Sequence, residues 1–93
     1  MVHCKVDFLG LRGDLADLES VEVDLNQGAD LGDLIAELKR KIPALEGIAF
    51  VSGENKLMGH YVFAINGRFH MNDSGIHIQN SDHILLLILV GGG

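Results

Sequence analysis

The sequence predicts a small α+β domain of two layers, in which one helix packs on a four- or five-stranded sheet. Two observations predict it. Apolar residues alternate with polar ones along several short segments, which is the pattern of strands with one buried face. A single stretch repeats its apolar residues at the 3.6-residue period of a helix. Two packed layers are the minimal way to bury both patterns, and 93 residues make one domain.

Two alternating segments near the start predict a hairpin. Apolar residues recur at every second position over 2–8 and again over 21–25. Gly10 and Gly13 lie in the connection between them, as expected where a chain changes direction. We therefore expect these two segments to pair as neighbouring strands.

One helix is predicted between Asp30 and Ile42. Asp30 is a preferred N-cap residue, and Asp33 lies in the first turn, where a negative charge favours the helix dipole. Pro43 disfavours a helical conformation in the residue before it, so the helix should end at about Ile42. The apolar side of the helix is formed by Leu31, Leu34, Ile35 and Leu38.

The region after the helix predicts an irregular connection followed by a second hairpin. Residues 44–60 contain three glycines and no sustained period, with a short strand expected over 48–51. Asn66-Gly67 is a strong hairpin signal. We therefore expect strands over 61–65 and 68–71 to pair across this turn.

The final strand is expected over 83–90, and its unbroken apolar run is typical of burial on both faces. Alternation divides the run into two sets, with Ile84, Leu86 and Ile88 on one face and Leu85, Leu87 and Leu89 on the other. One helix cannot cover both faces of the sheet. We expect Leu86 to pack beneath the helix and Leu87 to lie on a face that docks partners. The alternative is that loops cover the second set and both sets are core.

Three glycines, Gly91, Gly92 and Gly93, follow this strand at the end of the sequence. Glycine loses the most entropy on ordering and packs no side chain, so the run is not expected to stabilise a strand. Fully extended, three residues reach about 10 Å beyond the folded body. We expect a domain over 1–90 and a flexible tail over 91–93, thin enough to enter a narrow channel in a partner. A frayed end without a role is the alternative.

Composition excludes several function classes. The net charge of −6 argues against binding to nucleic acid and to anionic membrane surfaces. The single cysteine, Cys4, allows no internal disulfide and lies at an apolar position of the first strand, so we expect a buried structural thiol. The charged, alternating start does not have a signal-peptide pattern, and we expect a cytoplasmic protein. The histidines match no metal-ligand spacing, so no metal site is expected.

Seven short segments carry a resemblance to a known family, and they are Phe8-Leu9-Gly10-Leu11-Arg12, 21–25, Leu31-Gly32-Asp33-Leu34, Ile42-Pro43-Ala44-Leu45, Ala64-Ile65-Asn66-Gly67, Ser81-Asp82-His83-Ile84 and Val90-Gly91-Gly92-Gly93. In order and spacing they resemble the β-grasp sulfur carriers of the MoaD and ThiS type, which are relatives of ubiquitin. The resemblance covers nearly the whole chain, and its most specific feature is the terminal Gly-Gly. It implies the β-grasp fold, with a mixed sheet packed on one main helix.

The resemblance implies a sulfur carrier rather than an enzyme, although the chain could be the small subunit of one, such as molybdopterin synthase. An E1-like adenylyltransferase would use ATP to activate the carboxylate of Gly93, which would become a thiocarboxylate. A synthase subunit would then accept the sulfur for molybdopterin or tungstopterin, or next for thiamine. Gly91, Gly92 and Leu87 would contact these partners, and Leu85 and Leu89 share the face of Leu87. No cofactor is expected to be bound.

Two other functions remain open at this stage. A ubiquitin-like protein modifier would use the same terminal glycine to form an isopeptide bond with a lysine. A pure interaction module would bind partners through its sheet, and its glycines would be incidental. The carrier and the modifier begin with the same adenylate, so the sequence does not separate them.

Overall fold

The computed structural model of the chain describes residues 1–11, 13–71 and 75–89. Within them lie five strands, one α-helix and two short 3-10 helices, in the order β1 (Val2–Leu9), η1 (Gly13–Leu15), β2 (Ser20–Leu25), α1 (Leu31–Lys41), η2 (Pro43–Leu45), β3 (Tyr61–Ile65), β4 (Arg68–His70) and β5 (His83–Ile88). The predicted α+β domain, with one helix on a sheet of five strands, is confirmed. The expected boundary between 90 and 91 lies outside the described residues.

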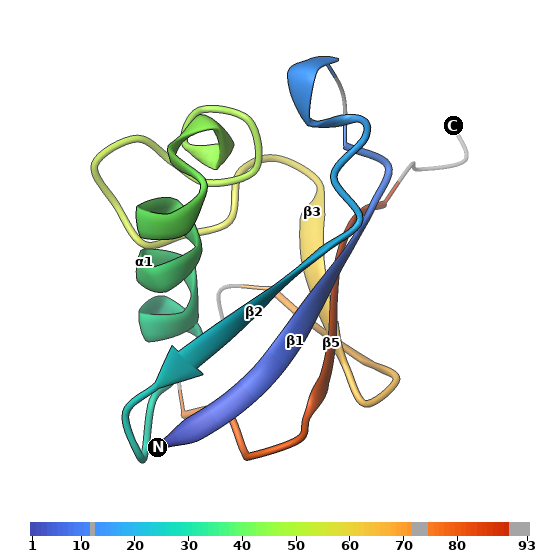
Figure 1. The fold of residues 1–93 in the computed structure, drawn as a ribbon. Coiled ribbons are helices and arrows are strands. Elements are labelled where there is room, and N and C mark those ends of the chain that lie inside the picture. Colours follow the sequence, from blue (N-terminus) through green and yellow to red (C-terminus); the bar gives the residue numbers. More distant parts are fainter. Residues whose placement is uncertain (12, 72–74, 90–93) are drawn as a thin grey trace.

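The strands form one mixed sheet with the order β2-β1-β5-β3-β4. The first strand and the last lie side by side at its centre and run parallel, whereas the other neighbours are antiparallel. In Figure 1 the sheet stands beside α1, with β1 in blue, β3 in yellow and β5 in red. The last strand, β5, pairs with both β1 and β3. The chain therefore ends its last strand in the middle of the sheet.

The helix begins and ends where the sequence predicts. The Asp30 carboxylate accepts a hydrogen bond from the backbone N–H of Asp33 at 2.9 Å, and the Asp33 carboxylate accepts one from the Asp30 N–H at 3.0 Å. This reciprocal capping box satisfies two N–H groups that have no partner within the helix. After Lys41 the chain turns into η2 at Pro43.

The core lies between α1 and the face of the sheet that the helix covers. Alternate residues of the four longer strands point into it, and among those less than 2 % exposed are Val2, Val6, Val23, Phe63, Ile84 and Leu86. The helix contributes Leu31, Leu34, Ile35 and Leu38, as predicted. Cys4 belongs to the same cluster at 3 % exposure, and burial raises the pKa of its thiol. The expected structural thiol is therefore confirmed as buried.

The connection between α1 and β3 does not contain the strand expected over 48–51. Phe50 makes only isolated bridges there, to Glu46 and Leu57, and its buried ring packs against Phe63 with 6.2 Å between centroids. The Lys39 ammonium instead holds the backbone, donating to the carbonyls of Val51 at 2.9 Å and Glu54 at 2.5 Å. Hydrogen bonds from a charged side chain of the helix thus replace the strand pairing that was expected for this connection.

The second hairpin forms across Asn66-Gly67 as expected. Both residues have positive φ, 51° and 86°, which is the geometry of the type I′ turn and explains the choice of asparagine and glycine. The fourth strand ends at His70, one residue earlier than predicted. The last strand ends at Ile88, although the Leu89 N–H still donates to the His60 carbonyl at 2.9 Å and so continues the pairing with β3.

Candidate docking face and C-terminal tail

The face of the sheet opposite α1, called here the open face, carries the other half of each strand. Pairing places Leu87 of β5 between Leu9 of β1 and Val62 of β3. One step back along β5, Leu85 lies between Asp7 and Ala64. The register therefore brings together apolar residues that are far apart in the sequence.

These residues form a continuous apolar patch, defined as Leu9, Val62, Ala64, Phe69, Leu85, Leu87 and Leu89. Its rim is open to solvent, because Leu9 is 58 % exposed and Phe69 is 60 % exposed. At its centre Val62 is fully buried, yet it lies outside the core cluster on the helix side. Large exposed side chains around a buried centre are typical of a surface that binds a partner.

The final strand divides its leucines as the alternation predicts. Leu86 is 0 % exposed and lies in the core beneath α1. Leu85 and Leu87 are half-buried on the open face, and Leu89 is 39 % exposed. The expectation that the run is buried on both faces is wrong. The lateral neighbours in the sheet shield the second set only partly, because the one α-helix of the described residues lies on the other face.

The β1–β2 side of the open face is polar and is called here the histidine–acid strip. The His3 ring contacts Asp24 through Nδ1 at 2.6 Å and Glu22 through Nε2 at 3.0 Å. The His83 Nε2 lies 3.2 Å from an Asp7 carboxylate oxygen. The hydrogen bond to Asp24, followed by that to Glu22, raises the pKa of His3, and the same contact with His3 lowers the pKa of Asp24.

The glycines that are predicted to react come directly after the last strand in the sequence. Gly91, Gly92 and Gly93 lie outside the described residues, so their roles stay predictions. Leu9 and Leu87 are partners in parallel strands, so β1 and β5 finish at the same end of the sheet. The described part of the last strand therefore ends beside the exposed rim of the apolar patch.

Four patch residues were not predicted as partner-binding from the sequence, and they are Leu9, Val62, Ala64 and Phe69. Leu9 breaks the alternation of the first strand with an apolar residue where a polar one is expected, and this was a usable signal. Phe69 and Val62 could be placed on the open face only once the register between β3, β4 and β5 was known. Strand pairing, rather than local pattern, assembles the patch.

Other kinds of site find little support in the described part of the chain. Residues 1–11, 13–71 and 75–89 contain no group of three or more His, Cys, Asp or Glu side chains able to hold a metal ion. No helix among them is both long and apolar enough to cross a membrane.

A match to a family model identifies the family of this chain. The model of the ThiS family matches residues 6–93. This protein belongs to the ThiS family. A search of curated protein sequences gave no significant match for this ThiS-family chain.

Solved structures similar to the ThiS-family chain cover at least 97 % of its length. The crystal structure of SAMP1 from Haloferax volcanii is 26 % identical, with a TM-score of 0.75 and coverage of 98 % of this chain and 99 % of that one. The small archaeal modifier protein 1 of Methanosarcina acetivorans is 26 % identical, with a TM-score of 0.72 and coverage of 100 % and 98 %. A putative molybdopterin converting factor, subunit 1, from Pyrococcus furiosus is 24 % identical, with a TM-score of 0.71 and coverage of 97 % and 100 %.

These likenesses establish the β-grasp fold that the sequence predicts. They place the ThiS-family chain among the small ubiquitin-like carrier and modifier proteins rather than among catalysts.

Proposed function

We propose that the chain is a sulfur carrier whose Gly93 carboxylate is activated and converted to a thiocarboxylate. The observation that carries the proposal is that the ThiS family match runs through residue 93. The geometry of the last strand supports it, because β5 carries the exposed apolar patch to the point where the tail begins. One continuous segment, the last strand with its tail, would then both dock on the partner enzyme and present the Gly93 carboxylate to it.

The proposed chemistry starts from a poor electrophile. A carboxylate oxygen of Gly93 attacks the α-phosphorus of ATP, pyrophosphate leaves, and an acyl adenylate forms. Sulfide then attacks the acyl carbon and AMP leaves, which yields the thiocarboxylate. If a persulfide attacks instead, the acyl disulfide that forms needs a thiol to reduce its S–S bond. All of these steps take place on a partner, an E1-like adenylyltransferase, and the ATP is bound there.

The chain itself contributes a docking face and a narrow tail. Leu85, Leu87 and Leu89 would pack against the activating enzyme and later against the synthase subunit that accepts the sulfur. Gly91 and Gly92 would occupy a channel too narrow for a side chain. Because activation consumes ATP, we place it in the cytoplasm. Molybdopterin or tungstopterin synthesis is the first proposed destination of the sulfur, and thiamine synthesis is the second.

Intact-mass analysis of the protein purified from its native host tests the proposal. A carrier should show a species in which one oxygen is replaced by sulfur, and tandem fragmentation should place it at Gly93. With the matching activating enzyme, ATP–pyrophosphate exchange should be abolished by deletion of Gly93 and by Gly92→Val, with unchanged thermal melts. Undiminished exchange by either variant would contradict the proposed role of the tail.

A second function is favoured by the 26 % identity to the two small archaeal modifier proteins. In that case the same adenylate would lead to an isopeptide bond between Gly93 and a lysine of a target. The same mass experiment separates the two functions, because a modifier gives a ladder of larger conjugates that is lost when Gly93 is deleted. Sulfur incorporation without conjugates indicates a carrier alone.

A further inference from the structure

The outer edge of β2 is open to a further strand. In the β1–β2 pair the Phe8 N–H donates to the Glu19 carbonyl at 2.9 Å, which sets the alternation of the antiparallel ladder. Antiparallel pairs exchange hydrogen bonds at every second residue. The backbone groups of Ser20, Glu22 and Asp24 therefore point away from β1, toward the edge of the sheet.

One of these outward groups has a partner within the described residues. The Glu22 carbonyl accepts a hydrogen bond from the Lys41 ammonium at the end of α1, at 2.9 Å. No other hydrogen bond joins the outward N–H and carbonyl groups of Ser20, Glu22 and Asp24 to the described part of the chain. An edge strand with free donors and acceptors is a template for pairing with another chain.

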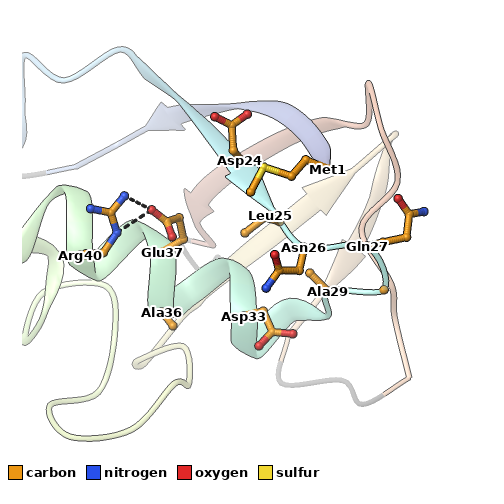
Figure 2. A pocket seen from close by; sticks show the side chains of 11 residues that line it. Met1, Asp24, Leu25, Asn26, Gln27, Ala29, Asp33, Ala36, Glu37 and Arg40 are labelled. Carbon is orange, nitrogen blue, oxygen red and sulfur yellow. Dashed lines mark hydrogen bonds and ion pairs between the residues drawn. The ribbon is translucent and has the colours of Figure 1, made fainter.

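A groove of about 460 Å³ lies along this edge, between the end of β2, the turn that follows it and α1. Figure 2 shows its two sides, with Asp24 and Leu25 on the strand and Ala36, Glu37 and Arg40 on the helix. A segment that pairs with β2 would lie beside α1, with its alternate side chains directed into this groove.

The charges that line the groove indicate which kind of segment would bind there. Three acidic residues line it against one basic residue, Arg40: Asp33 and Glu37 lie on α1, and Asp24 lies on β2, where its carboxylate contacts His3 on the open face. Arg40 is already paired with Glu37, whose side chain is only 21 % exposed. The groove thus has an excess of negative charge next to free backbone donors and acceptors, which favours a positively charged strand.

We propose that β2 and this groove bind an extended basic segment of a partner protein, which adds to the sheet as a further strand. Main-chain hydrogen bonds to Ser20, Glu22 and Asp24 would hold it, and lysine or arginine side chains at alternate positions would point toward α1 and the Glu37 carboxylate. This site does not depend on the proposed function. The strands that carry most of the apolar patch, β3, β4 and β5, lie on the other side of β1, so both surfaces are able to be occupied together.

The Lys41 side chain would compete with an added strand for the edge of β2. Its ammonium occupies the Glu22 carbonyl that an added strand would need. Replacing it by a side chain of similar length without charge frees the carbonyl and removes one positive charge near the groove. Lys41→Met should therefore bind a basic segment about three-fold more tightly.

The probe is the blocked hexapeptide acetyl-Lys-Val-Lys-Val-Lys-Val-amide, titrated into the full chain and followed by amide chemical shifts. The largest shifts should fall on Ser20, Glu22 and Asp24. Two further peptides carry N-methyl groups on all three lysines or on all three valines. Since only alternate N–H groups of an added strand face β2, one of these peptides should bind at least about ten-fold more weakly and the other nearly as well.

A matched pair of charge-neutralising variants tests the groove. Glu37→Gln should weaken binding about three-fold, whereas Glu54→Gln, at a 57 % exposed side chain in the connection after α1, should leave it unchanged. Equal binding of both N-methylated peptides would overturn the proposal, because attraction would then be by charge alone. Concentration-dependent pairing of two copies through β2, with the peptide excluded, would also overturn it.

Discussion

The same strands supply residues to both faces of the sheet, but one face forms the core and the other is open to partners. The covered face packs aliphatic residues of every longer strand against α1 and the connection that follows it. The open face is divided between the apolar patch, which lies mostly on β5, β3 and β4, and the histidine–acid strip, which lies mostly on β1 and β2. Because strand residues alternate between the faces, residues for stability and residues for recognition are direct neighbours in the chain.

The difference is sharpest along β5. Leu86 is completely buried, while Leu87 is half-buried beside the exposed Leu9. Substitutions one residue apart should therefore act on different properties of the molecule.

Leu86→Ala should destabilise the fold by about 2–5 kcal/mol, because it leaves a cavity beneath α1. Leu87→Ala should cost about 1 kcal/mol or less, because its side chain is only half-buried, yet it should weaken binding to the activating enzyme by more than about 1 kcal/mol. Chemical unfolding of both variants and titration of the folded Leu87→Ala protein measure the two effects.

Met58→Ala is the matched control for the Leu87 variant, because Met58 is an exposed apolar residue, at 39 %, in the connection on the helix side. It should change neither stability nor binding appreciably. If Leu87→Ala unfolds the domain while Leu86→Ala does not, the assignment of faces is reversed. If Leu87→Ala and Met58→Ala bind alike, the apolar patch is not the docking surface.

Lys39→Met should destabilise the covered side by about 1.5–3 kcal/mol. It removes the ammonium that bonds to the carbonyls of Val51 and Glu54, and hydrogen bonds to charged groups are worth about that much. Hydrogen exchange should speed up in the connection before β3, while the open face keeps its binding affinity. A simultaneous loss of partner binding would mean that the two faces are not independent.

Asp30→Ala should cost about 1 kcal/mol, because it removes the side-chain partner of the Asp33 N–H in the capping box. Asp30→Asn keeps an acceptor oxygen and should recover most of the loss. Thermal melts of the two variants give the comparison. Equal destabilisation by both would show that the charge, rather than the hydrogen bond, holds the start of α1.

The histidine–acid strip should make a small, pH-dependent contribution. The pKa of His3 is raised from 6.5, so its contribution is complete below that value and is lost as pH rises through the pKa of the folded protein. The pKa of Asp24 is lowered from 3.8, so its contribution is present above 3.8 and is lost as pH falls through the lower pKa of the folded state. The pair therefore stabilises most between these limits.

His3→Gln should remove this pH dependence. Its stability relative to the parent should be lowest between the ordinary pKa values of Asp24 and His3, and should approach that of the parent as pH rises above the raised pKa of His3. Unfolding curves across this range provide the measurement. A difference between the two proteins that stays constant with pH would mean that His3 acts by packing and not by charge.

Local patterns were enough for most of the fold. Asp30 and Pro43 mark the ends of the helix, and Asn66-Gly67 marks the second hairpin, because these residues act on the backbone next to them. The expected strand over 48–51 failed for the opposite reason. Phe50 is buried by contacts with Phe63 and by a connection tied to Lys39, and neither is visible in the sequence nearby.

The candidate site was predictable only along one strand. Alternation placed Leu85, Leu87 and Leu89 together, but it could not say which residues of other strands lie beside them. Val62 and Phe69 join the patch through pairing between strands that are distant in sequence. The docking role of the leucines and the chemistry of the glycine tail remain predictions for the binding and mass experiments.

The parallel pairing of β1 with β5 also sets the order of events during synthesis. Each pair in this ladder joins residues nearly the whole chain length apart, such as Val6 with Ile84. Contacts of such high sequence separation form slowly, because a long loop must close before they add stability. While the ribosome still holds β5, β1 and β3 have no strand between them. The sheet can therefore close only after β5 has left the ribosome, and until then β1 and β3 should stay without their shared partner.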